Sequence, residues 1–159
     1  MVDDKGIGDD VQLVIFKLST EEFGVDISQV REIIRVGEVT RIPGSPAYVD
    51  GVINLRGQVT TVVNLRNRLG MDGRPIDTNA RIMILEVDKN VIGVIVDSVT
   101  EVKNLASAQI DALPEALSSS VSSVYIQGVG KLDGRLLILV DLKQVIRDDI
   151  SRVSRGVAA

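Results

Sequence analysis

The chain of 159 residues contains no cysteine and no histidine. Without cysteine it can form no disulfide, no thiolate metal site and no cysteine nucleophile. Without histidine it lacks the usual general base, the commonest transition-metal ligand and any phosphohistidine chemistry. These absences remove the most familiar catalytic designs, so we expect a binding module that is not an enzyme and holds no metal or other cofactor.

Aromatic residues are scarce as well, since Phe16, Phe23, Tyr48 and Tyr125 are the only four. The formal net charge is −4 and the pI is near 4.9. Nucleic acid is bound by basic surfaces and stacking rings, so it is excluded as a partner. The longest unbroken apolar runs, such as Leu136–Val140, suit a buried strand and are too short for a signal peptide or a membrane span. We predict a cytoplasmic protein without membrane insertion.

The chain is instead rich in β-branched residues, with 25 valines and 17 isoleucines. Branching at Cβ suits the pleated, half-buried surface of a strand, so we predict an all-β protein with short helices. Strands are expected at Val11–Leu18, Phe23–Ile27, on both sides of an Arg-Gly turn within Gly51–Gly70, and at Arg81–Val87, Val91–Val96 and Leu136–Val140. Short helices are expected from Leu65 and Leu142, and polar connections at Ser19–Glu22, Ile42–Tyr48, Met71–Asn79 and Leu117–Ser123.

Two stretches of the sequence are repeated. The run GVINLRGQVTTVVNLR (Gly51–Arg66) aligns with GVGKLDGRLLILVDLK (Gly128–Lys143). Upstream, FGVDISQVREI (Phe23–Ile33) aligns with IGVIVDSVTEV (Ile92–Val102). Because both matches occur in the same order, we predict two diverged copies of one unit, at about residues 11–69 and 80–147.

Each unit offers four or five short strands, punctuated by glycine, and little helix. Strands with an exposed apolar face must be covered, and the sequence supplies too few helices for this. We therefore predict two small SH3-like β-barrels that pack together with pseudo-twofold symmetry, followed by a C-terminal helix. A single domain is expected over residues 11–147, with a flexible N-terminal tail over residues 1–10 and a C-terminal tail over residues 148–159.

Two aspartates, Asp97 and Asp141, follow apolar runs, where a catalytic or phospho-accepting carboxylate could lie. Helix capping explains them better. Asp141 precedes a helical stretch, and its counterpart in the other unit is Asn64, which is a good N-cap but no acid. Asp26 and Asp97 also precede short stretches that can form a helical turn. We therefore predict capping for these side chains and no catalytic residue.

The glycines form no phosphate-binding motif. Gly57 and Gly134 fall at equivalent hairpin turns, where a positive φ is expected. Arg56 precedes Gly57 and has Asp133 as its counterpart, so the two hairpin tips differ in charge. The difference suggests recognition of a partner, although a solvated turn charge explains it equally well. Glu32, at the end of an alternation of apolar and polar residues, could pair with Arg56.

The run RIPGSPAYVDGVINLRGQVTTVVNLRNRLG (Arg41–Gly70) resembles the signature of the CheW-like domain of bacterial and archaeal chemotaxis. The segments FGVDISQVREII, VIGVIVDSVTEV and YIQGVGKLDGRLLILVDL fit the same pattern, and so does the closing helix. The resemblance covers Val11–Arg147. It implies a fold of two β-barrels with a short helical tail, in agreement with the prediction from the repeats.

The resemblance also implies a function, that of a non-enzymatic adaptor between chemoreceptors and the histidine autokinase CheA. Such an adaptor binds the cytoplasmic helical tip of the receptor and the regulatory domain of the kinase, which has the same fold, within membrane-associated arrays. Glu32 and Arg56 match a charged pair that supports receptor coupling. The other positions that match the receptor-binding region are Val30, Gly51, Gly57, Gly93, Val99 and Val102.

Kinase contacts implied by the resemblance fall on two segments, and the candidate residues there are Val39, Ile42, Pro43, Ile110, Asp111 and Pro114. The second segment lacks an aromatic residue that related sequences can use in ring-forming contacts, so association with further copies in rings is left open. Two alternatives are a regulatory CheW-like domain cut from a CheA-type kinase and a generic SH3-like module for proline-rich peptides. The self-contained length argues against the first, and the scarcity of aromatic rings argues against the second.

Overall fold

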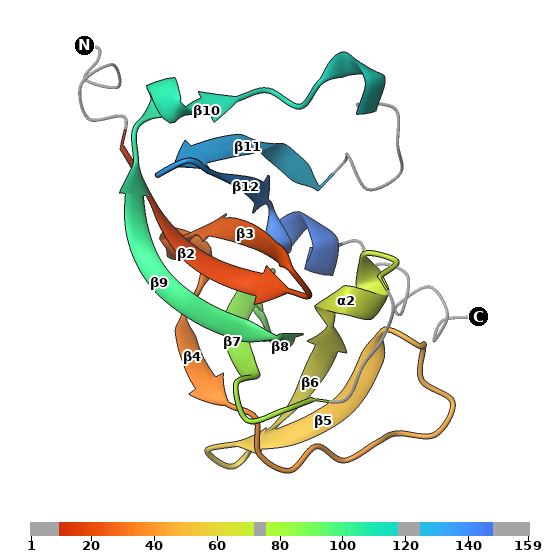
Figure 1. Cartoon of the computed structure of the whole chain (residues 1–159). Coiled ribbons are helices and arrows are strands. Elements are labelled where there is room, and N and C mark those ends of the chain that lie inside the picture. The colour runs from red at the N-terminus through yellow and green to blue at the C-terminus, as the bar shows by residue number, and fades with distance from the viewer. Residues whose placement is uncertain (1–9, 72–75, 118–124, 148–159) are drawn as a thin grey trace.

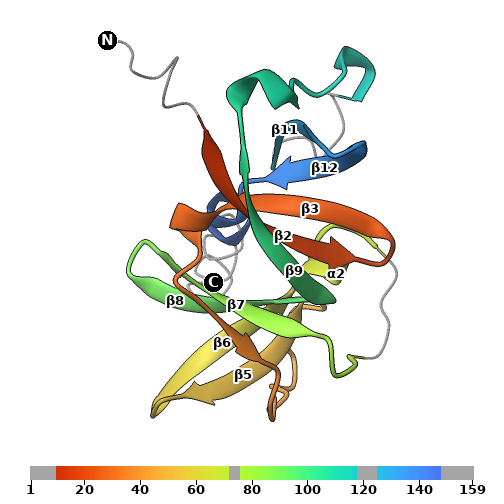
Figure 2. The same ribbon diagram turned by 60° about the vertical axis from the view of Figure 1, so that its left-hand side comes forward.

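The computed structural model describes residues 10–71, 76–117 and 125–147, and it folds them into two β-sheets (Figures 1 and 2). One sheet has five strands in the order β4-β7-β8-β6-β5, and the other has six in the order β10-β11-β12-β3-β2-β9. We call these sheets, with their connections, the five-stranded lobe and the six-stranded lobe. The prediction of a mostly β protein with short helices is confirmed.

The strands of the five-stranded lobe are β4 (Glu32–Arg35), β5 (Val49–Leu55), β6 (Gln58–Asn64), β7 (Arg81–Val87) and β8 (Asn90–Val96). Those of the six-stranded lobe are β2 (Val11–Leu18), β3 (Glu21–Asp26), β9 (Ser98–Leu105), β10 (Ile110–Asp111), β11 (Ile126–Leu132) and β12 (Arg135–Val140). The helical segments are α2 (Leu65–Arg68), a C-terminal helix at residues 142–147, and the 3-10 turns η1 (Ile27–Gln29), η2 (Ser107–Gln109) and η3 (Glu115–Leu117). The predicted strands β2 and β7 match the structure residue for residue.

Each lobe combines strands from both sequence repeats. The β7–β8 hairpin of the second repeat lies between β4 and β6 of the first, and the β2–β3 hairpin of the first lies between β12 and β9 of the second. The two insertions share a register, because Val62 pairs with Gly93 in the parallel pair β6–β8 and Leu139 pairs with Gly24 in the parallel pair β12–β3. The five-stranded lobe is therefore contiguous in sequence, whereas the six-stranded lobe is built from both ends of the described chain.

One glycine in each sheet allows that sheet to close on itself. Thr40, beyond β4, pairs with β5, and Asp111 of β10 pairs with β11. The facing strand has an irregular register at Gly51 (φ +146°) or Gly128 (φ +159°). A Cβ at Gly51 would lie 2.1 Å from the carbonyl oxygen of Thr40, and one at Gly128 would lie 2.7 Å from that of Asp111. Each lobe thus becomes a small barrel through a backbone contact that leaves no room for a side chain.

The largest apolar cluster lies between the lobes. This inter-lobe core has seventeen buried side chains, drawn from strands of both sheets and from both helices, whereas the clusters inside the six- and five-stranded lobes have six and five. Phe16 and Phe23 stack within it, with ring centroids 5.5 Å apart. Because burial of a large apolar side chain contributes roughly 2 kcal/mol, most of the apolar stabilisation joins the lobes, and we expect them to fold together.

The capping predictions are confirmed at three of the four positions. Asn64 and Asp141 each accept a hydrogen bond from the backbone N–H three residues further on, at 3.2 and 3.1 Å. Asp26 accepts one from the N–H two residues on, at 2.9 Å. The prediction for Asp97 is wrong, because the chain continues into β9, and its carboxylate binds Arg66 instead. Pairing of β9 with β2 along most of its length outweighs the local tendency to turn.

The predicted polar connection Ser19–Glu22 is too long. The turn between β2 and β3 takes two residues, with φ +58° at Ser19, and β3 begins at Glu21. The predicted tails fall on residues 1–10 and 148–159, of which all but residue 10 lie outside the described residues, as does most of the predicted loop Leu117–Ser123.

Candidate functional site

The hairpin between β5 and β6 places Arg56 at its tip. Arg56 has φ +48° and Gly57 has φ +89°, the pair of positive values that gives a two-residue turn the twist of the flanking strands. The N–H of Gly57 donates to Oδ1 of Asn54 at 2.7 Å, which closes the turn. The prediction of a positive φ at Gly57 is confirmed, and Arg56 has a positive φ as well.

The guanidinium of Arg56 binds Glu32 of β4 with two parallel hydrogen bonds. Nη1 donates to Oε1 at 3.2 Å, and Nη2 donates to Oε2. These bonds hold the pKa of Glu32 below its ordinary value of 4.5 and raise the pKa of Arg56. The Arg56 side chain is 68% exposed and that of Glu32 is 29% exposed, so both charges are accessible to a partner. The pairing expected from the sequence is confirmed.

This ion pair joins the two edges of the five-stranded sheet, because β4 and β5 are its outermost strands. A pocket of about 230 Å³ opens beside it. Both charged or polar and aliphatic side chains line it; its lining residues are Arg31, Glu32, Leu55, Arg56, Gln58, Ile84 and Val91. Such a lining can accept an aliphatic side chain of a partner while a fixed guanidinium and carboxylate orient the polar groups around it.

The six-stranded lobe carries a related ion pair whose arginine lies at another position. The hairpin tip there is Asp133, with φ +50°, but Arg135, two residues on, donates to Glu101 at 3.0 Å and to Glu22 at 3.5 Å. Glu101 is the repeat counterpart of Glu32. The hydrogen bond to Glu101 is the main cause that raises the pKa of Arg135. We did not predict Arg135 as a site residue, although the alignment of Glu101 with Glu32 was a signal that an arginine should lie nearby.

Of the three predicted receptor-binding valines, two lie at the junction of the lobes and the third is exposed on β9. Val30 and its counterpart Val99 are half-buried and pack against the inter-lobe core. Val102 on β9 is 44% exposed, and its counterpart Ile33 on β4 is 38% exposed. The structure thus presents exposed apolar side chains on both β4 and β9, each directly after the glutamate of an ion pair, Glu32 or Glu101.

Two of the predicted receptor-binding glycines are buried. Gly51 lies against the carbonyl of Thr40, and a Cβ at Gly93 would lie 2.7 Å from a methyl group of Ile82. Their positions support the backbone under the site, and a part in binding would be indirect. Gly57, in contrast, is exposed beside Arg56.

The candidate kinase-binding residues lie on both lobes. Val39 packs against the inner core of the five-stranded lobe, and Ile110 packs against that of the six-stranded lobe. Their neighbours Ile42, Pro43, Asp111 and Pro114 are exposed. Figure 1 shows β10 at the top of the molecule and the connection from β4 to β5 at the bottom. The two segments therefore form two separate surfaces.

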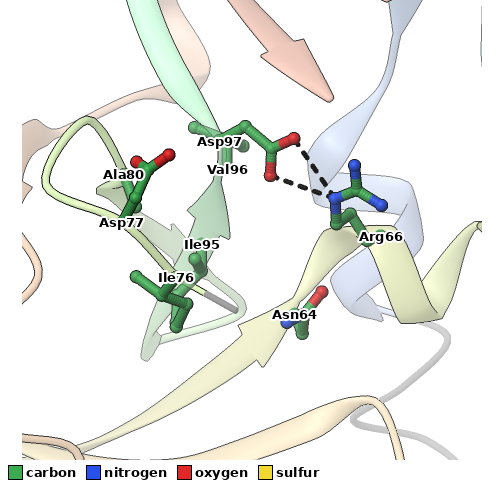
Figure 3. A pocket seen from close by; sticks show the side chains of 8 residues that line it. All are labelled: Asn64, Arg66, Ile76, Asp77, Ala80, Ile95, Val96 and Asp97. Carbon is green, nitrogen blue, oxygen red and sulfur yellow. Dashed lines mark hydrogen bonds and ion pairs between the residues drawn. The ribbon is translucent and has the colours of Figure 1, made fainter. Parts of the chain in front are cut away.

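Asp97 and Asp141, the two aspartates that follow apolar runs, make structural contacts. No three acidic side chains in the described part of the chain are grouped so that they could hold a metal ion. Asp97 is bound to Arg66 (Figure 3) at the edge of a pocket of about 10 Å³, which has room for about one water molecule. In the same part, no helix is long and apolar enough to cross a membrane.

The structure is thus one of two closed β lobes joined by a common core, with accessible charged and apolar side chains on its surface. The family model of the CheW-like domain matches residues 12–149. The chain is 36% identical to the chemotaxis protein CheW of Klebsiella aerogenes over 138 residues, which cover 87% of this chain and 82% of the relative. It is 32% identical to CheW of Bacillus subtilis, over 89% of this chain and 90% of the relative.

A solved structure gives the same result. The scaffolding protein TtCheW from Thermoanaerobacter tengcongensis superposes with a TM-score of 0.76 at 31% identity, over 85% of this chain and 86% of that one. The chain belongs to the CheW-like family. By this kinship it is a chemotaxis scaffolding protein, and the fold implied by the sequence resemblance is confirmed.

Proposed function

We propose that this chain is the adaptor that couples the cytoplasmic tip of chemoreceptors to the regulatory domain of the histidine kinase CheA, without catalysis of its own. In this role it resides in the cytoplasm and associates with receptor arrays through its partners. The observation that carries the receptor part is the accessible Glu32–Arg56 ion pair beside an aliphatic pocket.

The receptor surface combines this ion pair with the apolar residues at the lobe junction. A receptor tip is helical, and a helix presents apolar side chains on one face with charges along its borders. Val102 and the half-buried Val30 and Val99 offer the apolar contact, while Arg56 and Glu32 offer charges in a fixed orientation. Such fixed charges favour specificity over affinity.

The kinase surface rests on the exposed segment from Ile42 to Pro43 and on the segment from Ile110 to Pro114. These segments occupy related places beside the closure of each lobe. An adaptor needs a partner surface that is separate from its receptor surface. Two closure surfaces at opposite ends of the molecule also leave room for association with further copies in rings.

A generic module for proline-rich peptides has little structural support. Such modules stack prolines on exposed aromatic rings. Phe16, Phe23 and Tyr125 are buried, and Tyr48 is half-buried beneath Arg68, whose guanidinium carbon lies 5.8 Å from the ring centre.

The test is reconstitution of the purified chain with a soluble receptor-tip fragment and CheA, in which complex formation and kinase rate are both measured. Arg56→Glu should lower receptor affinity at least tenfold and abolish receptor-dependent kinase activation, while binding to CheA changes less than twofold. Arg147→Glu is the matched control, because Arg147 of the C-terminal helix forms an exposed pair with Asp88 of the β7–β8 turn. Normal activation by a folded Arg56→Glu protein would contradict the assignment of this site.

A further inference from the structure

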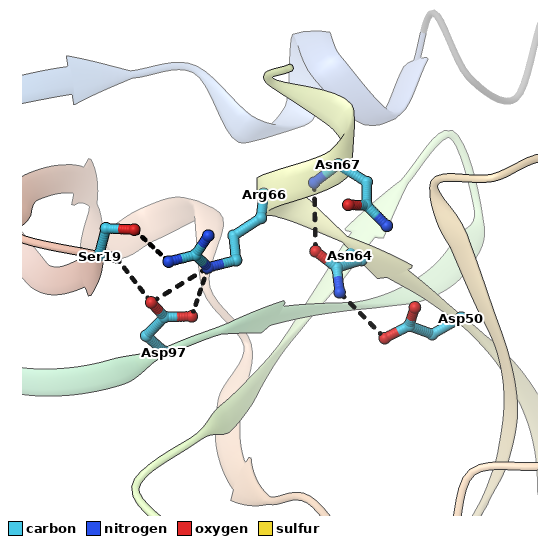
Figure 4. Close-up of polar contacts among 6 residues, drawn as sticks. All are labelled: Ser19, Asp50, Asn64, Arg66, Asn67 and Asp97. Carbon is cyan, nitrogen blue, oxygen red and sulfur yellow. Dashed lines mark hydrogen bonds and ion pairs between the residues drawn. The ribbon is translucent and has the colours of Figure 1, made fainter. Parts of the chain in front are cut away.

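Asp97 lies where the chain crosses from one lobe to the other. It follows β8 of the five-stranded lobe and precedes β9 of the six-stranded lobe. Its carboxylate accepts hydrogen bonds from Nε of Arg66 at 3.1 and 3.2 Å and from the N–H of Ser19 at 2.6 Å (Figure 4). Arg66 also donates to the hydroxyl of Ser19. One carboxylate thus joins three segments that are distant in sequence.

These segments belong to different lobes. Arg66 lies in α2, directly after β6 of the five-stranded lobe, while Ser19 lies in the β2–β3 turn of the six-stranded lobe. The side chain of Arg66 is 5% exposed and that of Asp97 is 20% exposed. Removal of two charges from water is costly and is offset only where the geometry is well matched.

The opposite junction shows that the repeated frame can be built without this ion pair. The counterpart of Arg66 is Lys143, at the start of the C-terminal helix. There the amide oxygen of Gln29 accepts hydrogen bonds from the N–H groups of Leu142 and Lys143, at 3.0 and 3.3 Å, and its nitrogen donates to Asp141 at 3.0 Å. A neutral amide of the η1 turn therefore binds the C-terminal helix where the other junction has a largely buried ion pair.

The position of the ion pair links it to the proposed receptor surface. Val99 and Val102 lie on β9, which begins one residue after Asp97, whereas Arg56 lies at the far end of the β5–β6 hairpin, whose strand β6 leads into Arg66. The direction in which β9 leaves the junction therefore sets the distance between its valines and the charged pair on the other lobe.

We infer that Arg66 and Asp97 are positioning residues for receptor binding. They hold β9 and the five-stranded lobe in the one relative orientation in which apolar and charged halves of the site face the same receptor helix. This inference rests on the adaptor function proposed above. It assigns to this largely buried pair control over receptor affinity but not over kinase affinity.

The first test is Asp97→Asn, which keeps the shape and an acceptor for the N–H of Ser19 but removes the charge that binds Arg66. Affinity for the receptor-tip fragment should fall at least tenfold, while affinity for the CheA regulatory domain should change less than twofold. Arg147→Gln, which breaks an exposed pair with Asp88, serves as the control and should leave both affinities within twofold. If Asp97→Asn fails to fold, Arg66→Lys, which keeps the charge, carries the same test.

The second test measures geometry without any partner. Because the chain has no cysteine, Arg35→Cys on β4 and Asn104→Cys on β9 can be spin-labelled at these two exposed sites alone. The label-to-label distance distribution should be narrow in the labelled parent and should shift or broaden when Asp97→Asn is added. An unchanged distribution, or a folded Asp97→Asn that binds receptor within twofold of the parent, would overturn the positioning role. A parent that binds no receptor fragment would instead contradict the adaptor function itself.

Discussion

Position for position, the five-stranded and six-stranded lobes are built on the same backbone contacts. In each lobe, the backbone carbonyl of a tyrosine accepts a hydrogen bond from the backbone N–H of a helix-capping residue. Asn64 donates to Tyr48 at 2.7 Å, and Asp141 donates to Tyr125 at 2.8 Å. Each lobe inserts a hairpin from the other repeat, and each closes against a glycine that has no room for a side chain. The contacts that build the two lobes were thus retained in both.

The charged side chains differ between these matched frames. An arginine at the hairpin tip binds Glu32 in one lobe, whereas in the other an arginine two residues further on binds Glu101. One inter-lobe junction contains a buried ion pair and the other a neutral amide. Backbone closure thus constrains the fold, while the charges have been free to diverge, and the diverged positions are where partner specificity should be sought.

The largest expected effect comes from adding a side chain to the glycine at which each lobe closes. Gly51→Ala should destabilise the protein by about 4–5 kcal/mol or prevent folding, because the new Cβ would lie 2.1 Å from a backbone oxygen at positive φ. Gly128→Ala should cost about 2–3 kcal/mol, since the corresponding distance is 2.7 Å. Urea unfolding of both variants measures the difference, and equal losses below 1 kcal/mol would show that both closures can relax.

A smaller effect should separate the two arginines. Arg135 bridges strands β3 and β9 and has a buried Nε, so Arg135→Gln should lower the melting temperature by a few degrees. Arg56→Gln, at an exposed tip, should leave the melting temperature within about 1 °C but lower receptor affinity. Thermal unfolding and receptor titration of the two variants test the contrast, and the reverse pattern would assign recognition to the six-stranded lobe.

The smallest effect concerns pH. Because hydrogen bonds from Arg56 lower the pKa of Glu32 in the folded state, the pair adds stability that is present above the pKa of the unfolded chain and is lost as pH falls through the lower folded pKa. Carboxyl NMR should show Glu32 titrating below 4.5, and Arg56→Gln should return the midpoint toward that value. A midpoint unaffected by Arg56→Gln would mean that the pair does not form in solution.

Much of the local structure follows from the sequence because its causes are local. The Arg56-Gly57 turn, the caps at Asn64 and Asp141 and the strand Val11–Leu18 each depend on residues that are neighbours in the chain. The repeat alignment also placed the matched glycines. In the site, the pairing of Glu32 with Arg56 was predictable because the two residue types are complementary and because the family resemblance implies a charged pair at these positions.

The rest depends on contacts between distant segments, which no local pattern encodes. The exchange of hairpins between repeats cannot be seen in an alignment, because either arrangement would bury the same apolar residues. The local sequence at Asp97 indicates a cap, whereas the residues that its carboxylate binds, Ser19 and Arg66, lie far away in sequence. The burial of Arg66 was likewise hidden, since an arginine at the start of a short helix is ordinarily exposed.

The exchanged hairpins bear on the origin and synthesis of the chain. Two copies that each lend a hairpin to the other have the topology of a domain-swapped dimer joined into a single polypeptide. During translation the five-stranded lobe has all its strands once β8 has emerged. In the six-stranded lobe, Phe23 of β3 can pair with Ile138 only after β12 has been made. Strand β2 can pair with β9 as soon as β9 has been made, but β3 remains without its other neighbour until β12 follows. A product truncated before β12 would therefore leave β3 as an open sheet edge.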